Sequence, residues 1–207
     1  MKKKFYSFAA FAFFCASLLF VSCNRDVDEP TSGAFDGRIT ATVVNGSQLN
    51  GIVSTVRLVY FEDWGGDVTL ATGTFSNGGF SLNLPEAVPS RYLFNIEEIF
   101  GGEISDTRTN ITFIGIDGGP LSLMGYNREG FPIGQFNRID RAYSATMWAI
   151  YIYVDRGVRI TGSDDWSDFD NISLTRGWNI MYTNPNSGGI ITTKDPGGLR
   201  WFFYPWD

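Results

Sequence analysis

The side chains that could carry out catalysis in this chain are mostly carboxylates. The sequence has no histidine and only two cysteines, Cys15 and Cys23. Without histidine a Ser-His-Asp or Cys-His site cannot form, and the usual zinc sites are excluded. Lys194 lies between Thr193 and Asp195, so it fits neither a phosphate-binding loop nor a Ser-x-x-Lys pair. Two carboxyl groups acting as in a glycosidase remain available, although no spacing singles out one pair among the 22 acids.

One dense group of acids has the chemistry of a cation site. It consists of Asp164, Asp165, Asp168 and Asp170, between two predicted strands. Carboxylate oxygens at this density are ligands that calcium prefers. The alternation of an EF-hand loop fails, however, because Trp166 occupies the third place counted from Asp164. We therefore expect a solvated loop without a cofactor, and calcium is the alternative.

Tryptophan supplies the second chemical signal, because aromatic faces stack on sugar rings while nearby Asp or Asn side chains bond to sugar hydroxyls. Trp64 lies close to two aspartates, and Trp166 lies among four. These two residues are the candidate glycan-binding residues. The alternative for each is a place in the core, which is the commoner role of tryptophan. The C-terminal segment 201–207 is predicted to be a last strand that docks Trp201 and Phe203, rather than a ligand platform.

The amino terminus has the pattern of an export signal. Three lysines follow Met1, residues 5–21 carry no charge, and Ser22 precedes Cys23. The segment 19–23 resembles the bacterial lipobox, with Phe20 at a position where leucine is usual. The resemblance implies that residues 1–22 are removed and that Cys23 becomes the lipidated first residue. Several acyl chains would then hold the protein on a membrane, whereas a permanent transmembrane helix is the alternative.

Export and lipidation also constrain the rest of the molecule. Cys15 would be lost and Cys23 modified, so no disulfide framework is expected. Residues 23–33 are polar and rich in helix breakers, which predicts a flexible tether. Its acidic residues resemble surface-export signals of some Gram-negative lineages, so we expect an outer-membrane location. Loss of residues 1–22 removes three lysines and no acid, which changes the formal net charge from −6 to −9 and excludes nucleic acid as a partner.

The remainder predicts an all-β fold. Short apolar runs alternate with Gly, Asn, Asp and Pro, which is typical of sandwiches and barrels. We predict two β-sandwich modules in tandem, 34–100 and 105–207, with a boundary near the Gly101-Gly102 pair. Strands are predicted at 38–44, 52–61, 67–75, 80–84, 110–116, 121–126, 142–154, 158–162, 171–175, 178–182, 190–193 and 199–204. The run 142–154 is apolar on both faces, which favours a central position.

Part of the first module resembles a known family. Residues 56–59 and 71–75, the turn 76–79 and the strand 80–85 together are similar to the prealbumin-like or carboxypeptidase-regulatory-like β-sandwich. The likeness covers residues 34–99 and implies a scaffold or spacer, without catalytic residues. Ser76 stands where many members have aspartate.

Together these observations predict a non-enzymatic lipoprotein of the cell envelope that serves in binding or assembly. Glycan capture is the sharper version of this hypothesis. A structural or adhesive component of fimbrial type is the first alternative, and it predicts strand exchange and polymers in solution. A carboxylate-dependent glycosidase is the second alternative, and it requires two carboxyls facing each other across a cleft.

Overall fold

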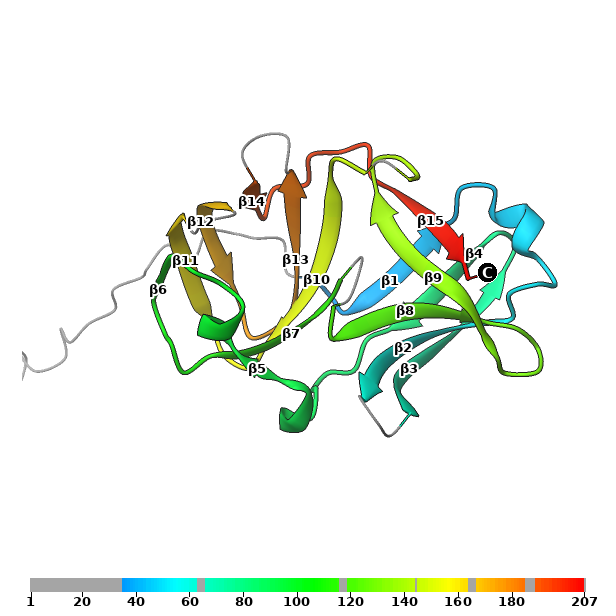
Figure 1. Ribbon diagram of the computed structural model, residues 1–207, viewed down its shortest axis with the longest axis horizontal. Coiled ribbons are helices and arrows are strands. Elements are labelled where there is room, and N and C mark those ends of the chain that lie inside the picture. The colour runs from blue at the N-terminus through cyan, green and yellow to red at the C-terminus, as the bar shows by residue number, and fades with distance from the viewer. Residues whose placement is uncertain are drawn as a thin grey trace, which may run out of the picture. The chain divides into compact units, whose positions relative to one another are not determined.

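One mixed β-sheet organises the computed structural model, in which three short 3-10 helices complete the regular structure of the described residues (Figure 1). The structure describes residues 35–62, 66–115, 119–143, 145–163, 167–184 and 189–206, all within one compact unit, Thr31–Asp207. The predicted all-β class is confirmed. No helix in this described part of the chain is long and apolar enough to cross a membrane.

The elements follow in chain order. They are β1 (Arg38–Thr42), η1 (Gly46–Leu49), β2 (Thr55–Glu62), β3 (Gly66–Ser76), β4 (Gly79–Asn83), η2 (Ser90–Tyr92), β5 (Phe94–Asn95), η3 (Ile96–Glu98), β6 (Glu103–Ile104), β7 (Asn110–Ile114), β8 (Leu121–Tyr126), β9 (Pro132–Ile139), β10 (Trp148–Val154), β11 (Val158–Ser163), β12 (Asp168–Leu174), β13 (Gly177–Asn184), β14 (Ile190–Thr192) and β15 (Arg200–Pro205).

Seven strands close into a ring, in the order β1, β4, β3, β2, β8, β9, β15. A parallel bridge between Val43 and Trp201 links the last strand back to the first. These strands occupy one half of Figure 1. The β3–β4 hairpin has the predicted turn, in which Asn77 and Gly78 both have positive φ, as a tight two-residue hairpin requires. Alternate side chains such as Phe80 and Leu82 point inward and are almost fully buried.

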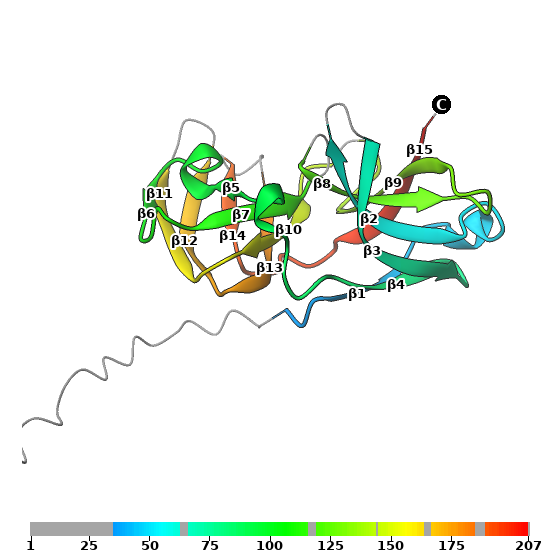
Figure 2. The same ribbon diagram turned by 90° about the horizontal axis from the view of Figure 1, so that it is seen from below.

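Seven of the other strands form the second half of the sheet, in the order β7, β10, β13, β14, β12, β11, β6, and the eighth, β5, pairs with β7. Both views show β11 and β12 at the far end from β15 (Figures 1 and 2). The strands of this second half enclose a separate apolar cluster, which contains Ile152 of β10, Ile160 of β11 and Ile172 of β12. Ile96 of η3 and the nearby Phe100 join the same cluster. Each half of the sheet therefore surrounds its own core.

Strand β10 separates the two cores, and its two-sided burial was predicted. Ile152 and Val154 belong to the second cluster, while Tyr151 and Tyr153 belong to the first. Tyr153 packs edge-on against Trp178 of β13, whose indole N–H donates to the carbonyl of Pro85 at 2.8 Å. The segment after β4 is thereby fixed against β10 and β13.

Three details differ from the sequence-based expectation. Three strands were not predicted: β5 and β6, which have two residues each, and β9, in which Gly134, Gln135 and Asn137 interrupt the apolar pattern. The run predicted to begin at residue 142 becomes a strand only at Trp148. Strands β8, β9 and β15, from the predicted second module, pair with each other and complete the ring around the first core. The finer division into two tandem sandwiches stays a prediction.

Candidate functional site

An apolar groove of about 430 Å³ lies where β15 passes the η1 segment and the loop after β9. Its lining residues in the described part of the chain are Val44, Asn45, Gln48, Leu49, Ile52, Ala142, Tyr143, Phe202, Phe203, Tyr204 and Pro205. None of these eleven residues is charged, although the sequence carries a formal net charge of −6. Ile52 is 55% exposed and Tyr143 is 85% exposed. Large apolar side chains are therefore presented to solvent in a concave surface.

The alternation of β15 creates one wall of the groove. Trp201 is buried against Phe80 and Tyr151, and the Phe203 ring lies 4.8 Å from that of Phe136. The predicted docking of Trp201 and Phe203 is confirmed. Phe202 and Tyr204 have the opposite orientation, because successive side chains of a strand point to opposite faces. The outer face of the docked strand was not predicted to bind, yet it lines the groove.

A hydrogen-bonded loop places Ala142 and Tyr143 at the opposite wall. The Asp140 carboxylate accepts the hydroxyl of Thr146 at 2.6 Å and the backbone N–H groups of Thr146 and Met147 at 2.9 and 3.2 Å. Burial raises the pKa of Asp140, but these hydrogen bonds outweigh it and hold the pKa well below its usual range. Because they turn the chain back before β10, Tyr143 lies in a loop and not in the predicted strand.

Tyr143 has an unusual backbone for a large aromatic residue. Its φ of 60° is left-handed, a region that costs roughly 1–2 kcal/mol for a residue with a Cβ. Its N–H donates to the Tyr204 hydroxyl at 3.3 Å, and the two rings meet edge to face with centroids 5.5 Å apart. Backbone strain of this kind clusters at active sites and ligand-binding sites.

Two side-chain amides border the apolar surface. Asn45 and Gln48 are exposed, and neither amide has a hydrogen-bond partner among the described residues. Their segment is fixed by a close approach of two glycines, because the Gly46 Cα faces the Gly78 carbonyl with no room for a Cβ. Val43 donates to that same carbonyl at 3.0 Å. The backbone that carries the two amides is therefore held in place, and no other described residue bonds to their polar atoms.

Charged residues lie near the groove without lining it. The Arg200 guanidinium lies 5.4 Å from the centre of the Phe202 ring, and Arg141 is paired with Asp140 at 3.3 Å. Farther along, Arg138 of β9 pairs with Asp195 at 3.0 Å. Asp195 also accepts the Tyr182 hydroxyl at 3.2 Å. The contacts among Arg138, Asp195 and Tyr182 hold the segment between β14 and β15 in place, and so fix where β15 begins.

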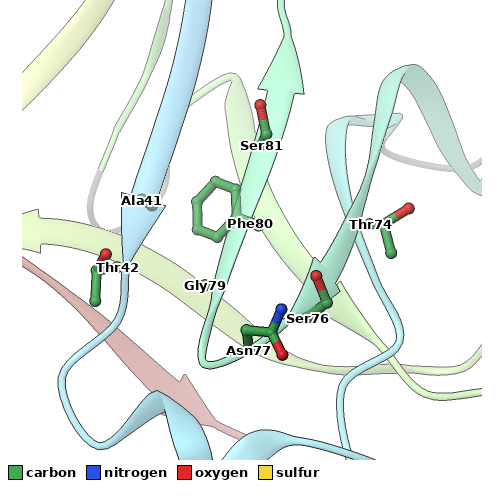
Figure 3. Close-up of a pocket in the computed structure, with 8 residues that line it drawn as sticks. All are labelled: Ala41, Thr42, Thr74, Ser76, Asn77, Gly79, Phe80 and Ser81. Carbon is green, nitrogen blue, oxygen red and sulfur yellow. The ribbon is translucent and has the colours of Figure 1, made fainter.

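A second depression lies on the outer face of β1, β3 and β4. Figure 3 shows its hydroxyl side chains, carried by three neighbouring strands: Thr42, Thr74, Ser76 and Ser81. The depression forms where Gly79 faces Thr42 on one side and Ser76 on the other, because a glycine leaves a gap in the row of side chains. Short hydroxyl side chains on a solvent face are common in sheets. The aromatic residue that lines it, Phe80, is 4% exposed and packs in the core, so the described part of this surface presents no exposed aromatic ring and the groove is the stronger candidate site.

The residues predicted from the sequence fall mainly outside the described part of the chain. Cys23, Trp64, Asp164, Asp165 and Trp166 all lie there. Asp168 and Asp170 are described and exposed. They lie on β12, which begins earlier than predicted because the intervening Phe169 is buried edge-on against Phe100. The described residues contain no group of three or more potential ligands that could hold a metal ion.

Comparison with family models, curated proteins and solved structures finds no match. Any functional conclusion therefore has to come from the site itself.

Proposed function

We propose that this chain is a lipid-anchored protein of the bacterial outer membrane that captures a glycan in the groove beside β15, without cleaving it. The observation that carries the proposal is the exposed Tyr143 ring, held in a strained loop beside two amides that have no hydrogen-bond partner among the described residues. The anchor on Cys23 and the two-module organisation belong to the same proposal, and they rest on the sequence patterns alone.

The groove has the composition that sugar recognition needs. A pyranose ring has apolar faces that pack on aromatic rings and hydroxyls that bond to amides, and Tyr143, Tyr204, Asn45 and Gln48 offer both kinds of partner. Its volume of about 430 Å³ lies within the range of roughly 300–1,000 Å³ typical of small-ligand sites. Asp140 and the glycine contact hold the two rims in place, which limits the ordering cost of binding.

Capture fits this surface better than hydrolysis does. Glycoside cleavage uses two carboxyl groups on opposite sides of the scissile bond, and none of the eleven lining residues is acidic. The nearest acid described above, Asp140, already accepts four hydrogen bonds from Arg141, Thr146 and Met147 of the loop that it closes. A chain with these features resembles a binding component more than an enzyme.

The test is retention on immobilised neutral polysaccharides. Tyr143→Ala removes the ring and should abolish retention while leaving the free energy of unfolding within about 1 kcal/mol, because an exposed side chain contributes little. Phe131→Ala is the matched control, since Phe131 is 63% exposed and does not line the groove. Failure of the native protein to bind any of a broad glycan panel, or equal loss in both variants, contradicts the proposal.

Trp166→Ala and Trp64→Ala belong to the same panel, because the sequence named these residues as stacking candidates. If the groove is the site, both variants keep their retention. If either tryptophan variant loses retention while Tyr143→Ala keeps it, glycan capture stands and its location in the groove is wrong. Polymers in solution, together with no glycan binding, would favour the adhesive alternative.

A further inference from the structure

On the outer edge of β15, one residue has both a backbone N–H and a carbonyl without a hydrogen-bond partner among the described residues. In antiparallel pairing, both polar groups of a residue point to the same side, and the side alternates along the strand. The Trp201 carbonyl accepts the Val44 N–H at 2.8 Å, so the backbone N–H and carbonyl of Trp201 point towards β1 and away from β9. The backbone N–H and carbonyl of Phe203, two residues later, must point to the same side.

Gly134 supports this assignment independently. It lies in β9 with its Cα against the Tyr204 carbonyl, so close that a Cβ would not fit. Tyr204 therefore points its carbonyl at β9, and its neighbour Phe203 points its N–H and carbonyl away. Among the described residues, no hydrogen bond from another segment reaches the Phe203 backbone. The Phe203 ring packs against Phe136, and Phe203 is one of the residues that line the groove, so we place its unpaired backbone groups at the edge of the groove.

We infer that the Phe203 N–H and carbonyl are the polar recognition element of the groove, and that they bind two adjacent hydroxyls of one sugar ring. The N–H donates to one hydroxyl oxygen, and the carbonyl accepts the proton of the next hydroxyl. The Tyr143 and Tyr204 rings flank this edge and supply the apolar contact. This inference rests on the proposed glycan-binding function and adds the chemistry of the ligand.

An extended peptide is the other class of molecule that binds strand edges, and β15 is poorly suited to it. Strand addition needs a ladder of alternating donors and acceptors. On this edge, Trp201 is already bonded to the segment after β1, and Pro205 has no N–H. Only Phe203 remains between them. A compact polyhydroxyl ligand can use a single donor and acceptor pair, whereas a peptide strand cannot build a ladder on it.

Amide hydrogen exchange measured at single residues tests whether the Phe203 N–H binds the sugar. In the free protein it should exchange faster than the amides of Phe202 and Tyr204, which are bonded to β9. A saturating neutral oligosaccharide that the native protein binds should slow exchange at Phe203 and leave Phe202 and Tyr204 unchanged. Glycan binding with no change at Phe203 overturns the inference alone, whereas binding of no glycan overturns the proposed function with it.

A matched pair of variants separates the N–H from the ring. Phe203→Leu keeps the N–H and loses the ring, while Phe203→Pro loses both, at an edge position where proline leaves the ladder to β9 intact. We expect Phe203→Pro to bind the oligosaccharide about tenfold more weakly than Phe203→Leu, as loss of one hydrogen bond predicts. Equal affinity, or protection of Phe203 by a pool of unstructured peptides and by no glycan, overturns the inference.

Discussion

Trp201 and Phe202 are neighbours on β15, and replacing each with alanine should have very different consequences for stability. Trp201 is 7% exposed, meets Phe80 edge-on at 5.3 Å and stacks on Tyr151 at 5.9 Å. It also lies at the bridge that closes the ring of strands. Phe202 faces the groove and is only half-buried. The two substitutions therefore compare the inner and outer faces of one strand.

The expected magnitudes follow from burial. Truncating a fully packed tryptophan to alanine costs roughly 3–5 kcal/mol, because transfer energy is lost and a cavity remains. A half-exposed phenylalanine should cost about 1 kcal/mol, near the centre of the distribution for point mutations. Since a domain of this kind has a free energy of unfolding of roughly 5–15 kcal/mol, Trp201→Ala should remain folded but be clearly destabilised.

Equilibrium urea denaturation followed by circular dichroism measures both variants on the same scale. The midpoint of Trp201→Ala should fall strongly and that of Phe202→Ala slightly, with similar slopes. A difference of less than about 1 kcal/mol between the variants would refute the reasoning, because burial alone separates them by more. The reverse order would mean that β15 has the opposite register.

Three further predictions concern other parts of the chain. The pKa of Asp140 is lower in the folded protein than the unfolded value of about 3.9, so its carboxylate stabilises the fold fully above that value. This stabilisation is lost as the pH falls from the unfolded pKa towards the folded pKa. Asp140→Asn should therefore lose less stability than the native protein between about pH 5 and 2, as measured by denaturation at each pH. A chelator should leave the melting temperature unchanged if the 164–170 segment is metal-free, and a drop of several degrees would make its aspartates calcium ligands. Mass spectrometry of membrane-extracted protein should find lipid on Cys23, and a retained 1–22 segment would contradict the lipobox interpretation.

Most of the strands could be predicted from the sequence because their patterns are local. The Asn77-Gly78 turn between β3 and β4 is an example, since both residues favour the left-handed conformation that the turn requires. The two-sided burial of β10 follows from apolar residues at consecutive positions. Strand β9 could not be found in this way, because its polar Gln135 and Asn137 bond to each other inside the sheet. Its place depends on partners distant in sequence, β8 and β15.

The groove could not be predicted from local sequence patterns, because its position depends on which strand edge stays unpaired in the fold. The pattern of segment 201–207 correctly indicated that Trp201 and Phe203 face the core, and this made the whole segment look structural. When one face of a strand packs in the core, the side chains of the other face point outward. Whether the edge of that strand meets solvent or another strand depends on tertiary pairing, which the sequence pattern does not show. Here the ring closes at Trp201 and stops, so the edge from Phe203 to Pro205 lies against the η1 segment with no strand on it. The position at which the ring closes thus creates the groove and leaves the Phe203 N–H and carbonyl without a partner among the described residues.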